Sequence, residues 1–367
     1  MHRSTRLTLL ALLLLLIAST HAFAQSSCTP HFPREDGKHN GWQGGDAVYS
    51  IPLPDGRVVW IFGDTLYGAK RVVNGLHPNM TRNSVGVSTC KNGAWHLQYT
   101  MRRDAHGVPV SFFEPKNPTH WYWAMDGFYA NGRVWISLLC MRQPKNSKPS
   151  AFDFEGCGSD LAEVTNPTAP PQQWRVKIHP LVPDGAKAYP AATTVVEGEY
   201  AYLFATDERA PHPLVATRIP LSGLSTPQAH LQYLAQDGTW KPGFVPMDAK
   251  AVMPTASSEL SIRYHADRKQ WIAIMMSPQF LSNKLILRTA PSLLGPWSED
   301  HTLYTVPEMG PQDKNVFCYA GKEHPEFESN DLLITYVCNT TLIPDLATKP
   351  NIYLPRVERL HFDTTAH

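Results

Sequence analysis

The chain has 367 residues, of which 43% are hydrophobic and 10% aromatic, and it contains 32 prolines and 23 glycines. Its 33 basic and 32 acidic residues nearly cancel, so the sequence gives no electrostatic footprint for nucleic acid and we expect no such partner. Many turn-forming residues without sustained helical periodicity indicate an all-β protein built from short strands.

The first 24 residues have the features of an export signal. Arg3 and Arg6 precede an apolar run over Leu7–Ala18, and Ala22-Phe23-Ala24 provides a small-x-small cleavage motif. The run is shorter than the roughly 20 residues that a transmembrane helix needs. We therefore predict a signal peptide over residues 1–24, a single domain over 25–367, and a secreted or periplasmic protein without a membrane span after signal removal.

Five segments along the chain share one pattern, in which an apolar strand, a tight polar turn and a second apolar strand follow one another. They are Gly45–Asp64, Met125–Cys140, Ala191–Asp207, Glu259–Met276 and Glu323–Asn339. Their turns recur roughly every 70 residues, as the hairpins of propeller blades do. A β-sandwich also has many short strands, but it has no reason to repeat at this interval. The sequence therefore predicts a five-bladed β-propeller.

The cysteines predict disulfide bonds. An even number of cysteines in an exported chain favours disulfides, although the sequence leaves their pairing open. No C-x-x-C or H-E-x-x-H motif is present, so we expect neither a metal ion nor a cofactor. The six cysteines are Cys28, Cys90, Cys140, Cys157, Cys318 and Cys338.

The first hairpin carries an aspartate at each end. In a propeller, the start of every first strand and the end of every second strand emerge on one face, where they form a pocket. If the turn at Pro54-Asp55-Gly56 pairs Leu53 with Arg57, an unbroken register places Asp46 directly opposite Asp64. Cross-strand Cβ atoms lie roughly 4.5–5.5 Å apart, and opposed like charges are destabilising. A catalytic pair explains that repulsion, because one shared proton separates the two pKa values into an acid and a base or nucleophile.

Other hairpins add candidates for the same pocket. Glu259 precedes its turn by almost as many residues as Asp46 precedes its own turn. We therefore expect Glu259 at a similar height along the central channel, where it would be a third catalytic carboxylate. Asp126 is nearer to its turn and is expected deeper in the channel, as a substrate contact or a strand-start acceptor. Lys322, His324 and Glu326 alternate, so in a strand they share one face, which lines either the channel or the solvent.

Sugars are bound by aromatic stacking and by planar polar groups. Trp42 lies just before the Gly44-Gly45-Asp46 motif, and Arg82-Asn83 follows the first hairpin. We predict these three side chains as substrate contacts, with a core position as the alternative for Trp42.

The opening blade resembles a known glycosidase family. The motifs that carry the resemblance are Trp42-x-Gly44-Gly45-Asp46, Trp60-x-Phe62-Gly63-Asp64-Thr65 and Arg82-Asn83-Ser84, with Glu259 and His324-Pro325-Glu326 in later blades. They resemble the endo-D-arabinanase glycoside hydrolase family first catalogued as domain of unknown function 4185, whose studied members act on mycobacterial arabinan. The resemblance implies a five-bladed propeller with Asp64 as nucleophile and Asp46 as general acid/base of a retaining mechanism. The cysteines are not a feature of that family.

These observations favour an exported glycoside hydrolase that cleaves furanosidic linkages, with the D-arabinan of cell-wall arabinogalactan as the first polysaccharide substrate. Three alternatives remain open at this stage. One is a glycosidase acting on a different exported polysaccharide, the second is a propeller that binds glycan without cutting it, and the third is a non-enzymatic interaction scaffold.

Overall fold

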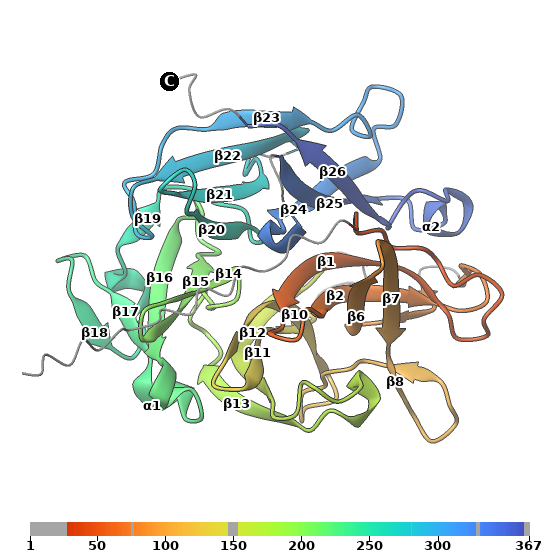
Figure 1. The fold of residues 1–367 in the computed structure, drawn as a ribbon, viewed down its shortest axis with the longest axis horizontal. Helices are drawn as coiled ribbons and strands as arrows, with labels where there is room; N and C mark the ends of the chain where they lie inside the picture. The colour runs from red at the N-terminus through yellow and green to blue at the C-terminus, as the bar shows by residue number, and fades with distance from the viewer. Residues whose placement is uncertain (1–27, 75–76, 146–152, 280, 328–330, 363–367) are drawn as a thin grey trace, which may run out of the picture.

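The computed structural model describes the chain except residues 1–27, 75–76, 146–152, 280, 328–330 and 363–367. The predicted signal peptide therefore lies outside the described residues. The described residues form five small antiparallel sheets in sequence order, arranged around a common centre (Figure 1). The predicted five-bladed β-propeller is confirmed.

Each blade is built from consecutive strands. Blade 1 contains β1 (Trp42–Pro52), β2 (Val58–Tyr67), β5 (Met80–Thr81), β6 (Ser84–Lys91) and β7 (Ala94–Thr100). Blade 2 contains β10 (His120–Ala130), β11 (Arg133–Arg142), β12 (Glu155–Val164) and β13 (Val176–Val182). Blade 3 contains β14 (Thr193–Glu197), β15 (Tyr200–Thr206), β16 (Leu214–Pro220), β17 (Gln232–Leu234), β18 (Trp240–Pro242) and β19 (Ala251–Met253).

The last two blades complete the ring. Blade 4 contains β20 (Ser261–His265), β21 (Gln270–Met276), β22 (Lys284–Ala290) and β23 (His301–Thr305), and blade 5 contains β24 (Val316–Glu323), β25 (Leu332–Thr340) and β26 (Pro355–Leu360). Two short ribbons pair β3 (Val73–Asn74) with β4 (His77–Pro78) and β8 (Arg102–Arg103) with β9 (Pro109–Val110). The helical segments are single turns: α1 (Pro227–His230), α2 (Asp345–Thr348), η1 (Pro171–Gln173), η2 (Leu221–Gly223), η3 (Pro246–Asp248) and η4 (Pro325–Phe327).

The first strands of the blades lie nearest the centre (Figure 1). Each of β1, β10, β14, β20 and β24 contacts its neighbours in this inner ring, and β24 closes the ring against β1. Both faces of β1 are buried because a neighbouring blade covers each of them. Tyr49 and Ile51 pack with Ile136 of blade 2, whereas Val48 packs with Leu333 of blade 5. The continuous apolar character of these strands follows from this double burial.

The predicted hairpin turns are confirmed in the first four blades. In blade 2, for example, Asn131 and Gly132 both adopt positive φ, which a two-residue hairpin turn of this handedness requires. The hairpin of blade 5 differs from the prediction, because β24 ends at Glu323 instead of beginning there. Pro325 has no N–H to donate to a strand ladder, and the chain enters the short helix η4 at this point.

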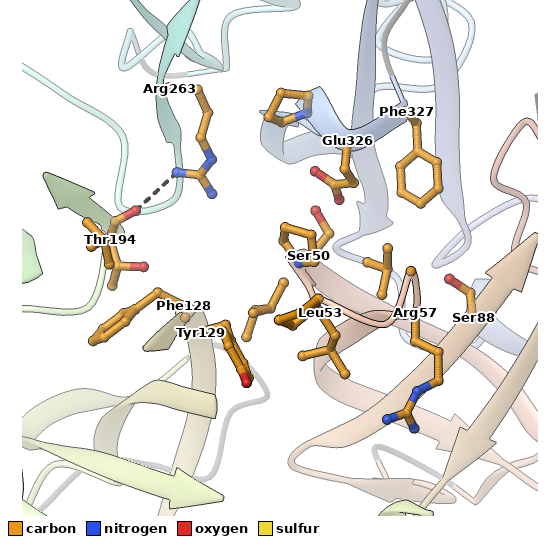
Figure 2. Close-up of a pocket in the computed structure, with 18 of the residues that line it drawn as sticks. Ser50, Leu53, Arg57, Ser88, Phe128, Tyr129, Thr194, Arg263, Glu326 and Phe327 are labelled. Carbon is orange, nitrogen blue, oxygen red and sulfur yellow. Dashed lines mark hydrogen bonds between the residues drawn. The ribbon is translucent and has the colours of Figure 1, made fainter. Parts of the chain in front are cut away.

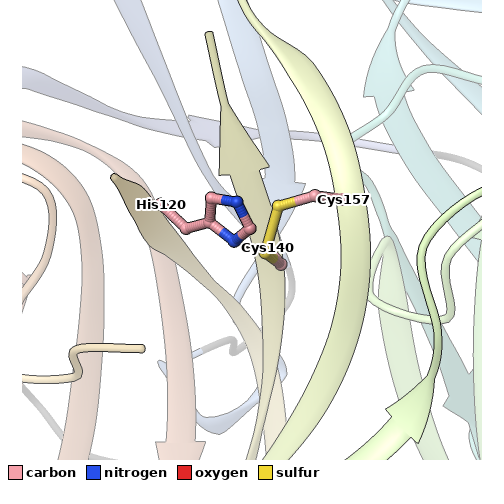
Figure 3. Close-up of side chains that lie close together, drawn as sticks. All are labelled: His120, Cys140 and Cys157. Atoms are coloured by element: carbon pink, nitrogen blue, oxygen red, sulfur yellow. Dashed lines mark hydrogen bonds between the residues drawn. A yellow bond between two sulfur atoms is a disulfide. The ribbon is translucent and has the colours of Figure 1, made fainter. Parts of the chain in front are cut away.

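All six cysteines are paired. Cys28 joins Cys90, Cys140 joins Cys157, and Cys318 joins Cys338 across the β24–β25 pair. The second bond lies beside His120 (Figure 3), whose Nδ1 is 3.6 Å from the Cys140 Sγ. Because both sulfur atoms are consumed by the disulfide, this group is not a metal site. Among the described residues, no helix is long and apolar enough to cross a bilayer.

Candidate active site

A cavity of about 650 Å³ opens at one end of the central channel and contains the three predicted catalytic carboxylates. Asp46 comes from the start of β1, Asp64 from the second half of β2, and Glu259 from the segment before β20. Aromatic side chains from the starts of β10 and β24 complete its walls. The lining therefore combines the starts of first strands with the ends of second strands, as the sequence predicted. The aromatic lining residues include Trp121, Trp123, Phe154, Phe317, Tyr319 and Tyr353.

The register between β1 and β2 is broken at the catalytic pair. Gly45 pairs with Thr65, but Ala47 pairs with Phe62, so Asp46 faces the two-residue segment Gly63-Asp64. A second irregularity at Val48 restores the predicted register toward the turn. The prediction of direct Asp46–Asp64 pairing through an unbroken ladder is wrong, although the bulge still directs both side chains into one cavity.

The backbone beside Asp46 adopts an unusual conformation. Ala47 and Val48 have φ values of 63° and 61°, which L-residues rarely adopt and which is especially unfavourable for a β-branched side chain. Such residues persist only where the surrounding structure holds them, and they concentrate at functional sites. The bulge that directs Asp46 into the cavity therefore contains a strained backbone.

Asp46 is held as an acid. The hydroxyls of Tyr319 and Tyr353 both donate to its Oδ2, at 2.7 and 2.9 Å. Burial, together with the negative charges of Asp64 and Glu259, raises the pKa of Asp46 to about 8, although the hydrogen bonds from the two tyrosines oppose the rise. At neutral pH the Asp46 carboxyl is therefore mainly protonated and can donate a proton.

Asp64 has a different environment. Arg82 Nη1 contacts its Oδ2 at 3.2 Å, and the indole N–H of Trp123 donates to its Oδ1 at 3.2 Å. The Arg82 guanidinium also lies 4.5 Å from the ring centroid of Trp121, which fixes its orientation. Burial raises the pKa of Asp64, but Arg82 and Trp123 oppose that rise because they stabilise the carboxylate form. The pKa of Asp64 therefore remains raised, but Asp64, unlike Asp46, has a cation beside it that favours the charged form.

Glu259 is paired with Lys322. The Lys322 Nζ lies 3.3 Å from Glu259 Oε2, and the lysine side chain is only 1% exposed. This Nζ also donates to the carbonyl oxygens of Ala47 and Ala320. All three ammonium protons are committed within the protein, so Lys322 has none left for a sugar hydroxyl. Its predicted role as a substrate contact is wrong.

Two of the predicted sugar contacts are core residues. Trp42 is fully buried and stacks on Tyr99 at a centroid distance of 4.3 Å. Asn83 is fully buried as well, and it bridges the backbone of Phe113 and Tyr122 through three hydrogen bonds. Both residues support the loops around blade 1 but present no surface to a substrate. Of the predicted contacts in blade 1, only Arg82 lines the cavity.

Asp126 is also structural. It is completely buried, accepts hydrogen bonds from Thr193 Oγ1 and the Thr194 N–H, and forms an ion pair with Arg263 at 3.2 Å. These contacts connect blades 2, 3 and 4 below the cavity. The prediction of Asp126 as a substrate contact is wrong, since its carboxylate is satisfied within the protein.

His324 and Glu326 belong to the opposite mouth of the channel. His324 is fully buried, with Nδ1 2.7 Å from Ser50 Oγ and Nε2 2.7 Å from Thr335 Oγ1. Glu326 lines a second cavity of about 780 Å³ at the β1–β2 turn, where it faces Arg263 (Figure 2). The two residues do not share a strand face with Lys322, because β24 ends before them. Their predicted contact with substrate in the carboxylate cavity is wrong.

Two tyrosines and two tryptophans of the site are not among the residues predicted from the sequence. Trp121 and Trp123 flank Tyr122 at the start of β10, and this dense aromatic motif was a usable signal. Tyr319 lies before the segment predicted as the first strand of blade 5, because β24 begins at Val316 and not at Glu323. Tyr353 follows β25 in an irregular segment, and no pattern in the sequence marks it.

Comparisons with known proteins agree with the fold. A family model described as "Domain of unknown function (DUF5005)" matches residues 35–357. A structure of a candidate hydrolase from Bacteroides ovatus ATCC 8483 aligns with a TM-score of 0.67 and 19% identity over 88% of this chain and 87% of that chain. No curated protein matches the sequence.

Two glycosidase structures align less closely. A xylan β-1,4-xylosidase from Bacillus halodurans C-125 has a TM-score of 0.50 and 10% identity over 88% of this chain and 54% of that chain. An exo-β-1,3-galactanase from Phanerochaete chrysosporium, bound to β-1,3-galactotriose, has a TM-score of 0.50 and 10% identity, covering 92% of this chain and 64% of that chain. At these identities the likeness concerns the fold alone.

Proposed function

This chain belongs to the family described as a domain of unknown function (DUF5005), and we propose that it is a glycoside hydrolase acting in the carboxylate cavity. Asp46 is the general acid/base, Asp64 is the nucleophile, and Glu259 keeps the proton on Asp46. Hydrolysis of glycosidic bonds by a pair of carboxyl groups needs one protonated and one ionised member.

The observation that carries this proposal is the unequal environment of two aspartates in one cavity. Asp46, with its pKa raised to about 8, is a proton donor at neutral pH. Asp64 contacts a guanidinium and an indole N–H, both of which favour its charged form. Titratable groups whose surroundings separate their pKa values in this way are assigned acid and base roles.

The adjacency of the two strands supports a retaining mechanism. Carboxyl groups of retaining enzymes are about 5–5.5 Å apart, whereas inverting enzymes leave room for a water molecule between substrate and base. Asp46 and Asp64 come from neighbouring strands, and Asp46 Oδ1 lies against Gly63, next to Asp64 in the chain. In this scheme Asp64 attacks the anomeric carbon while Asp46 protonates the leaving oxygen. Water then attacks the anomeric carbon of the glycosyl ester on Asp64, Asp46 removes a proton from that water, and the Asp64 carboxylate leaves.

The cavity walls suit a neutral saccharide. Aromatic faces such as those of Trp121 and Phe317 stack on the apolar faces of sugar rings, and Arg82 can hold a hydroxyl oxygen. The blade-one motifs favour a furanoside, so D-arabinan is the first substrate to test. The xylosidase and galactanase that share this fold support glycosidic hydrolysis as the reaction class. Three disulfides support action outside the cytoplasm, in the periplasm or the medium.

The test is release of reducing ends from mycobacterial arabinogalactan, followed by a screen of other arabinans, galactans, xylans and fructans. We expect the wild-type protein to release reducing ends, and Asp46→Asn and Asp64→Asn each to abolish release while retaining the far-UV circular dichroism spectrum. NMR of the first-formed anomer separates retention from inversion. Release that survives both substitutions would refute the assignment.

The alternative function is glycan binding without cleavage, which the aromatic lining of the cavity would also serve. Binding of a polysaccharide by calorimetry, with no product from any member of the screen, would favour this alternative. Cleavage of a polysaccharide other than arabinan would keep the mechanism and change the substrate.

A further inference from the structure

Lys322 connects three parts of the cavity through one buried ammonium group. Its Nζ contacts the carbonyl oxygens of Ala47 and Ala320 and the carboxylate of Glu259. The same group lies 4.3 Å from the ring centroid of Tyr49, below the cavity floor. A buried ammonium with all three donors used and an aromatic face beneath it has a fixed position.

The two carbonyl groups belong to unusual backbone positions. Ala47 has a φ of 63° and Ala320 has a φ of 58°, and each lies within a register break, in β1 and in β24 respectively. Non-glycine residues in this conformation are held there by their surroundings. Lys322 supplies a charged hydrogen bond to the carbonyl oxygen of each, and such bonds are stronger than those between neutral groups.

Each of these residues directly follows a residue of the site. Ala47 follows Asp46, and Ala320 follows Tyr319, whose hydroxyl donates to Asp46. The acid, its hydrogen-bond donor and Glu259 are therefore each either in contact with this one ammonium group or adjacent in the chain to a residue that is. These three groups come from blades 1, 5 and 4, and among the described residues no hydrogen-bonded ladder joins these blades to one another.

We propose that Lys322 is the positioning residue of this site, which holds the bulges of β1 and β24 so that Asp46, Tyr319 and Glu259 meet at the cavity floor. It acts through other residues and does not touch the substrate. The inference rests on the proposed function for its catalytic meaning, but its structural content can be tested without a substrate.

The first test compares Lys322→Met with Arg263→Met by crystallography. Arg263 is the matched control because it is another largely buried cation of the channel, paired with Asp126, and it contacts none of the cavity carboxylates. In Lys322→Met we expect the Asp46 carboxyl to lose its hydrogen bond to Tyr319, whereas Arg263→Met keeps it. An Asp46–Tyr319 bond that persists in Lys322→Met overturns the proposal. If Lys322→Met does not fold, Lys322→Gln, which retains two donors without the charge, replaces it in the same comparison.

The second test separates positioning from charge. Glycine adopts positive φ without the steric penalty of a Cβ, so Ala47→Gly and Ala320→Gly reduce the need for Lys322. When the two glycine substitutions are added to Lys322→Met, Asp46 should return to within hydrogen-bond distance of Tyr319. The kcat on the substrate identified by the screen should then be at least tenfold higher than that of Lys322→Met alone. Absence of both recoveries would show that Lys322 contributes charge alone.

A titration that needs no substrate completes the design. NMR of the Asp46 carboxyl carbon measures the titration of that group. The other charged groups around it are Asp64, Glu259, Asp126, Arg82 and Arg263. Loss of the Lys322 charge should raise the pKa of Asp46 above its wild-type value, and Arg263→Met should leave it nearly unchanged. An unaltered Asp46 titration in Lys322→Met contradicts the inference. An inactive wild-type protein contradicts only the proposed function.

Discussion

The two mouths of the propeller channel contain similar residue types in different arrangements. At the cavity of Asp46 and Asp64, acidic groups face one another and the strand register is broken. Toward the opposite cavity, β1 and β2 pair regularly from Tyr49↔Ile61 to Pro52↔Val58, and Arg263, which lines that cavity, balances the buried Asp126 below the carboxylate cavity. Burial lowers the pKa of His324 there, so that histidine remains neutral between two hydroxyl groups.

This difference shows where the fold contains features that lower its stability. Backbone strain and unbalanced like charges are unfavourable, and regular blades avoid both at the turn end of the first hairpin. The coincidence of both features at the mouth with Asp46 and Asp64 is consistent with the proposal that the chemistry takes place there. A cavity by itself does not make the distinction, because the two cavities are of similar size.

The largest expected effect is a difference in kcat between variants that remove a carboxylate at one mouth of the channel and at the other. Asp64→Asn should lower kcat by about 10³–10⁴-fold, because the group that attacks or deprotonates is lost. Glu326→Gln, the control at the opposite mouth, should change kcat by less than about threefold. Steady-state kinetics on the substrate found in the screen measures both. Equal losses in the two variants would place the chemistry elsewhere.

A second comparison concerns stability. Asp126→Asn leaves Arg263 buried without a full counter-charge, and breaking a buried ion pair in this way costs about 3–5 kcal/mol. Urea denaturation should show this loss at pH 7, with kcat per folded molecule nearly unchanged. A strong loss of turnover in the folded fraction would instead connect Asp126 to the chemistry.

A glycine substitution tests the packing of the acid. A Cβ added at Gly63 would lie 2.4 Å from Asp46 Oδ1, so Gly63→Ala must displace the carboxyl. We expect kcat to fall about 10–100-fold, since small misplacements of catalytic groups have effects of this order. Gly310→Ala is the matched control, because the nearest atom to its added Cβ is 3.6 Å away. Unchanged kcat in Gly63→Ala would show that Asp46 can act from a second position.

The sequence predicted what depends on local pattern and failed where the chain leaves that pattern. Four hairpin turns followed from turn residues between apolar strands, and the shared cavity of Asp46 and Asp64 followed from the propeller geometry. The bulge at Asp46 has no signature of its own, because Ala47 and Val48 are ordinary strand residues that tertiary contacts hold at positive φ.

The failures at the later residues have physical causes as well. The chemical types of Trp42 and Asn83 suit a sugar site, and only the packing of blade 1 shows that both are buried. His324 and Glu326 alternate as strand residues do, yet Pro325 between them lies in a helical turn. Tyr353 reaches Asp46 from a segment more than 300 residues away in sequence, so no local pattern can reveal it.

A smaller effect on stability should accompany the loss of the acid. Native Asp46 keeps its proton up to about pH 8, whereas an aspartate in the unfolded chain ionises near pH ~3.9. Between these values the native state binds more protons, so this group lowers stability as the pH rises. Asp46→Asn should therefore raise the free energy of unfolding at pH 7 by about 0.5–2 kcal/mol, a common gain when an active-site group is removed. The gain should disappear in urea titrations near pH 4.

The smallest effect is a displacement of the pH profile. Activity requires a protonated Asp46, so kcat should fall as the pH rises through about 8. The negative charge of Glu259 raises the pKa of Asp46, and Glu259→Gln removes that charge while leaving Lys322 positive nearby. The lost negative charge and the remaining positive charge of Lys322 both favour ionised Asp46. The alkaline limb of the kcat profile should therefore move to lower pH. Lys322→Met should move the same limb to higher pH, and the opposite signs follow from one electrostatic cause. A limb that moves in the same direction in both variants would mean that a group other than Asp46 controls it.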